Sequence, residues 1–127
     1  MIRRAVFILL FSAFPVLPHH SFAAEFDVAR PITANGTVSR FAWTNPHAFL
    51  YMDLKDENGQ VATWEFEMGS PNSLLRCGLT RGSVHAGESL MVKGYRSKDG
   101  SHRGYAVEVK RKDGRVIYSR PIGSPAP

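Results

Sequence analysis

The sequence predicts a mainly β protein, a small OB-like barrel of five or six strands with one short helix between strands three and four. Runs of β-type residues, separated by turn signals, extend from residue 32 to residue 118. One helix signal interrupts them after the third run, which is where the five-stranded OB barrel has its helix. A meander of three strands leaves its edges unpaired, whereas a closed barrel hides them. An open β-sandwich is the alternative.

Alternating side chains define the first three predicted strands. These strands cover residues 32–43, 47–55 and 60–68. Gly36 in the first strand indicates a bulge or the close approach of another strand. Alternate residues of a strand face the same side. The apolar faces of the second and third strands are formed by Leu50, Met52 and Leu54, and by Ala62, Trp64, Phe66 and Met68.

A two-turn helix is predicted over residues 72–77. Ser70 is a good N-cap, Pro71 suits the first helical position, and Gly78 can end the helix. Its apolar residues are Leu74 and Leu75. The later strands are predicted over residues 88–96, 103–111 and 116–118, the last of them after an Asp-Gly turn.

The N-terminus predicts export. Residues 1–23 read as a secretory signal peptide, because two arginines are followed by an uncharged run over residues 5–17. That run is shorter than the ~20 apolar residues of a membrane-spanning helix, so no permanent membrane span is expected. Residues 24–120 form a single domain of the predicted barrel type. The tail, residues 121–127, is rich in Pro and Gly and is predicted to be disordered.

The cleavage point has two candidates. Ser21 and Ala23 supply the small residues that signal peptidase requires, which favours cleavage before Ala24. Cleavage before His19 is the alternative, and it would place Pro18 beside the scissile bond. The choice decides whether the mature protein keeps its only pair of adjacent histidines.

Charge and cysteine content narrow the classes of partner. Removal of residues 1–23 takes away two arginines and lowers the formal net charge from +5 to +3. The basic residues concentrate in residues 93–120, which we interpret as a solvated β-surface rather than a polyanion site. Export also argues against a nucleic-acid partner.

The single cysteine, Cys77, is predicted to be a small buried side chain in the helix of a monomer, with a disulfide-linked dimer as the alternative.

Several short segments resemble one family. They are His19-His20-Ser21-Phe22, Trp43-Thr44-Asn45-Pro46-His47 and Trp64-Glu65-Phe66-Glu67. Through these segments, the chain from His19 to about Val116 resembles a group of small exported bacterial proteins that are classed as a domain of unknown function. The resemblance implies a small β-barrel in the periplasm or secreted, and it implies no activity. Family members usually carry a small residue where this chain has Pro18.

A metal site is the most specific chemical hypothesis. His19, His20 and His47 offer imidazole ligands that suit copper or zinc, with Met52 or Met68 as softer ligands for copper. The chain has no His-x-His motif and no cysteine spaced as a metal ligand, and cleavage before Ala24 would remove the adjacent histidines. A structural or solvated role for these histidines is therefore favoured.

The favoured function is a binding or accessory module without evident catalytic activity, working in the periplasm or outside the cell. Its small ligand, or a periplasmic protein, is expected near the barrel mouth at Trp43, Asn45, His47, Trp64 and Glu65. Asn45-Pro46 is also a turn signal. Glu65 and Glu67 share one face and are interpreted as exposed carboxylates, and His85 and His102 as solvated loop residues. A subunit that docks by strand addition is a further alternative.

Overall fold

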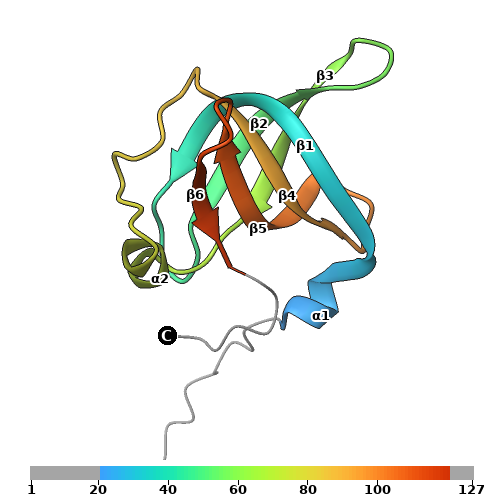
Figure 1. Cartoon of the computed structure of the whole chain (residues 1–127). Coiled ribbons are helices and arrows are strands. Elements are labelled where there is room, and N and C mark those ends of the chain that lie inside the picture. The colour runs from blue at the N-terminus through green and yellow to red at the C-terminus, as the bar shows by residue number, and fades with distance from the viewer. Residues whose placement is uncertain (1–20, 121–127) are drawn as a thin grey trace, which may run out of the picture.

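Six strands form one sheet that closes on itself (Figure 1). The computed structural model describes residues 21–120. The strands are β1 (Phe26–Ala42), β2 (Phe49–Lys55), β3 (Val61–Glu67), β4 (Ser89–Ser97), β5 (Arg103–Arg111) and β6 (Val116–Ser119). Their order is β3-β2-β1-β4-β5-β6, and β3 also pairs with β5 in parallel, which closes the ring. This is an OB-like arrangement, as predicted, and the open β-sandwich is excluded.

Strand β1 joins the two halves of the sheet. Its first part pairs with β4 and its last part with β2, and Gly36 pairs with residues of both, Leu54 and Leu90. A Cβ atom at Gly36 would fall against the Asp53 carbonyl oxygen. The predicted close approach is therefore confirmed. The strand starts six residues earlier than predicted, because Phe26 and Asp27 also pair with β4, ahead of an irregularity between Asp27 and Pro31.

Helix α2 (Pro71–Arg76) covers one end of the closed sheet (Figure 1). The Ser70 side chain caps it by accepting a hydrogen bond from the Ser73 backbone N–H. Leu74 is fully buried, but Leu75 is 52% exposed, so only one of the two predicted leucines packs inward. The Cys77 prediction was wrong as well. Cys77 lies at the C-cap and is exposed, because the helix ends at Arg76 and the chain leaves the buried face there.

The core lies inside the closed sheet and under α2. Its large, fully buried side chains come from all six strands and the helix region: Val38, Leu50, Met52, Phe66, Met68, Leu74, Val92, Val109 and Tyr118. The inward faces predicted for the second and third strands are thus confirmed. A second short helix, α1 (Phe22–Glu25), precedes β1 and was not predicted. Neither helix in residues 21–120 has the length and apolar character needed to cross a membrane.

Candidate functional site

The five predicted ligand-binding residues do not form one site. Trp64 is buried on the inner side of β3, whereas Glu65, the next residue, is directed to the outer side. Trp43 packs edge-on against Phe41, with ring centroids 5.8 Å apart, and completes the core. Asn45 is exposed in the β1–β2 loop and precedes a cis peptide bond to Pro46. The outer side and the open end of the sheet are therefore considered separately.

On the outer side, Glu65 is the centre of a polar row across four strands. Its carboxylate accepts hydrogen bonds from the Tyr51 hydroxyl at 2.9 Å and from Arg103 Nε at 3.0 Å. The Arg40 guanidinium lies over the Tyr51 ring, 4.1 Å from its centroid. Because both oxygens of Glu65 are occupied and Arg103 is its partner in the β3–β5 pairing, this row closes the ring. We therefore interpret this row as stabilising the fold.

Glu67 was predicted to be an exposed carboxylate, and that prediction was wrong. Its side chain is 13% exposed, since it lies in register between Phe49 and Tyr105, and its Oε1 is 3.0 Å from His47 Nδ1. Burial, and then the nearby Glu25 carboxylate, raise the pKa of Glu67 to about 7, whereas Arg103 lowers it. The Glu67 carboxyl and the His47 ring therefore lie within hydrogen-bond distance of each other on a largely buried part of β3.

The part of the chain that the structure describes contains no assembled set of metal ligands. No group of three or more His, Cys, Asp or Glu side chains there is placed to hold an ion. Met52 and Met68 are fully buried in the core, so the structure does not bring them to His47. His19 and His20 lie outside the described residues.

A hollow of about 700 Å³ opens at the end of the sheet away from α2. The β2–β3 turn projects beside it, on the opposite side of the molecule from that helix (Figure 1). Its apolar lining consists of side chains that continue the core: Ile32, Ala34, Leu54, Ala62 and Trp64. Its polar rim consists of Thr33, Asn35, Lys55, Asp56, Gln60, Arg96 and His102.

Two polar side chains of this hollow contact the Trp64 ring. The His102 ring stacks on the indole with centroids 5.1 Å apart and planes 22° from parallel. The Arg96 guanidinium carbon lies 5.0 Å from the Trp64 ring centroid, a cation–π contact. No hydrogen bond or ion pair of the Arg96 guanidinium is found within residues 21–120. The open end therefore holds a guanidinium with donors free for a ligand.

Sequence reasoning placed Trp64 at the mouth but missed Arg96 and His102. A signal for Arg96 exists in the alternation of β4, where Leu90, Val92 and Gly94 are buried and Arg96 continues the same inward series. A charge on the core face of a strand end indicates an opening to solvent. His102 has no comparable signal, since its contact with Trp64 depends on how β5 is placed beside β3.

Two turns beside the hollow are each built around one aspartate. In the β2–β3 turn, Asp56 Oδ1 accepts hydrogen bonds from the backbone N–H groups of Asn58 and Gln60. In the β4–β5 turn, Asp99 Oδ1 accepts from Ser97 and Ser101, which lowers the pKa of Asp99 to about 2, with Ser101 as the largest cause. Each turn is thus held in part by hydrogen bonds to its own aspartate.

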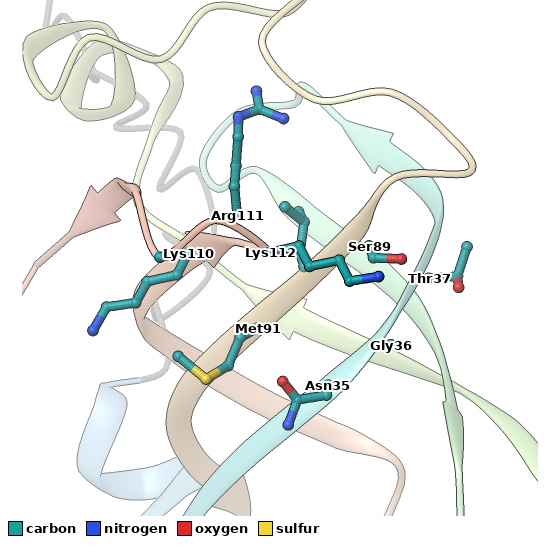
Figure 2. A pocket seen from close by; sticks show the side chains of 10 residues that line it. Asn35, Gly36, Thr37, Ser89, Met91, Lys110, Arg111 and Lys112 are labelled. Atoms are coloured by element: carbon teal, nitrogen blue, oxygen red, sulfur yellow. The ribbon is translucent and has the colours of Figure 1, made fainter.

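A second hollow, of about 460 Å³, lies where β1, β4 and the end of β5 meet (Figure 2). Lys112 extends across it towards Ser89, whereas the Arg111 side chain points away. Arg111 pairs with Glu88, and Lys110 Nζ is 3.0 Å from Glu108 Oε1. Two of its three basic residues are thus already paired, and no aromatic side chain lines it. We regard the Trp64 hollow as the better ligand site.

Comparisons with known proteins give a family. A family model described as a family of unknown function, DUF6152, matches residues 8–106. No curated protein matches the chain. Among solved structures, the mitochondrial single-stranded DNA binding protein Rim1 of S. cerevisiae matches with a TM-score of 0.48 and 9% identity. That match covers 65% of this chain and 92% of the Rim1 chain.

Proposed function

The chain belongs to DUF6152, a family whose name assigns no activity, and we propose from the site alone that it is a module that binds a small organic anion in the Trp64 hollow. We place this activity in the periplasm or outside the cell, because the N-terminal sequence has the features of an export signal. The observation that supports the proposal is the guanidinium of Arg96, which lies over the Trp64 ring at the open end of a largely apolar hollow.

The hollow has the size and lining that a small ligand requires. Ligand pockets usually measure about 300–1,000 Å³ and combine an apolar wall with a few placed polar groups. Here the apolar wall is the end of the core, and the polar groups stand on one rim. A ligand would lay its hydrocarbon part against Ile32 and Leu54 and turn its charged end to Arg96.

The charge of the ligand follows from the guanidinium. A planar guanidinium offers paired N–H donors that match a carboxylate, and such a charge-assisted bond contributes about 1.5–3 kcal/mol. The guanidinium lies over the Trp64 ring and makes no hydrogen bond within residues 21–120, so its N–H groups are available for that bond. Lys55 adds positive charge to the same rim, although Asp56 offsets part of it.

Fluorescence titration tests the proposal. The chain has two tryptophans, so the Trp43→Phe variant makes Trp64 the only indole reporter. We expect phenylacetate or hexanoate to change its emission saturably, and the neutral amide of either acid to bind about tenfold more weakly. Arg96→Gln should weaken binding of the acids by about tenfold and leave the amides unaffected.

The matched control is Arg115→Gln, since Arg115 is exposed in the β5–β6 turn away from the hollow. This variant should bind the acids normally. Equal affinity for acid and amide would overturn the assignment of an anionic ligand. The absence of saturable binding by both classes would overturn the proposed function itself.

A further inference from the structure

We propose that Phe22 is a structural part of the mature exported domain, so that proteolytic processing occurs upstream of Ser21 and not at the Ala23–Ala24 bond that residue preferences favour. The inference takes export from the proposed function and does not depend on the ligand. It rests on contacts that α1 makes with the closed sheet.

Phe22 belongs to an aromatic cluster that spans three strands. Its ring centroid lies 4.9 Å from that of Tyr105 on β5, 5.6 Å from that of Phe26 on β1 and 6.1 Å from that of Tyr95 on β4. Phe26 is itself buried, with 3% exposure. Removal of Phe22 would uncover this side of Phe26 and of both tyrosines, which apolar packing disfavours.

The backbone of α1 is fixed to the β4–β5 turn. The Ala23 carbonyl oxygen accepts a hydrogen bond from Lys98 Nζ at 2.6 Å, and the Glu25 carbonyl oxygen accepts from the Lys98 backbone N–H at 2.8 Å. The Glu25 carboxylate lies 3.8 Å from Arg103 Nη2. These contacts connect the segment to the arginine that also pairs with Glu65 at the ring closure.

Cleavage after Ala23 would reverse the electrostatics at this point. It removes the carbonyl that Lys98 binds and creates an α-ammonium group at Ala24, beside the Lys98 ammonium. The Lys98 and Ala24 ammonium groups would then repel each other at the place where Lys98 now donates a hydrogen bond to the Ala23 carbonyl oxygen. Of the two cleavage points that the sequence suggests, only the one before His19 keeps both Phe22 and the Ala23 carbonyl.

Mass spectrometry of the exported chain, purified from periplasm or medium, tests the proposal directly. A mass that includes Phe22 supports it, and a mass that begins at Ala24 or later overturns it. If the chain is not exported, it appears only in the cell lysate at full length, and that result rejects the export on which the inference rests. Neither result depends on the Arg96 titration, so the two proposals fail separately.

A variant of the full chain gives a second readout. Phe22→Ala should lower the Tm of the exported protein by about 5 °C or more, because the cluster loses its central ring. Val28→Ala is the matched control, since Val28 is 60% exposed on β1, and its Tm should shift by no more than about 2 °C. If processing removed Phe22, the Phe22→Ala protein would match the unsubstituted one in both mass and Tm, and the proposal would be wrong.

Discussion

The two ends of the closed sheet differ in what fills them. At the α2 end, Leu74, Met68 and Tyr118 are almost completely buried, and the Gly69 backbone N–H donates to the Tyr118 hydroxyl at 3.3 Å. At the other end the core stops at Trp64. The His102 ring stacks on the indole there, and the Arg96 guanidinium makes a cation–π contact with it. The same sheet is therefore closed by packed side chains at one end and left open at the other, where we propose that a ligand binds.

The largest change in stability should come from removing a buried side chain at the α2 end. Leu74→Ala leaves a cavity under α2 and should lower the free energy of unfolding by about 2–5 kcal/mol, measured by urea denaturation. The neighbouring Leu75→Ala should change it by less than about 1 kcal/mol, because Leu75 is half exposed. Anion binding at the open end should persist in the folded Leu74→Ala protein. A parallel loss of binding would contradict the separation of the two ends.

Glu67 should make the α2 end sensitive to pH. Its pKa is about 7 in the folded protein and near 4.5 when unfolded, so the folded state holds the proton more tightly. The stability that the neutral carboxyl contributes is complete below pH 4.5 and is lost as pH rises to 7. Relative to Glu67→Gln, the unsubstituted protein should lose about 2 kcal/mol of unfolding free energy between pH 5 and pH 8.

The control for this measurement is Glu57→Gln in the exposed β2–β3 turn. Stability should follow the same pH curve in that variant and in the unsubstituted protein. If Glu67→Gln also followed that curve, the buried carboxyl would not be the group responsible.

The smallest effect should appear at the open end. His102→Ala removes one ring from the Trp64 stack and should weaken phenylacetate binding by about threefold to tenfold, or roughly 1 kcal/mol, in the same fluorescence titration. Stability should change little, because His102 is exposed. His85→Ala is the control, because His85 is also exposed but does not line the hollow, and it should leave the affinity for phenylacetate unchanged. An equal loss in both variants would show that His102 is not a specific contact.

The difference between the ends also explains what the sequence could predict. Strands, inward faces and the helix cap are local patterns, so Trp64, Phe66 and Ser70 were assigned correctly. The exposure of Leu75 and Cys77 depends on how α2 sits on the sheet, which the six-residue helix does not reveal. The pairing of Glu67 with His47 depends on the register of β2 against β3, and the contact of Arg96 with Trp64 depends on how the closing sheet places β4 beside β3; neither follows from a local pattern.

The two aspartate-centred turns bear on how much of the protein a ligand would have to order. Asp56 Oδ1 and Asp99 Oδ1 each accept hydrogen bonds from backbone N–H groups of their own turn, so both turns already have a defined shape. A ligand in the Trp64 hollow would therefore not need to fix these turns on binding, and the proposed binding would lose little conformational entropy there.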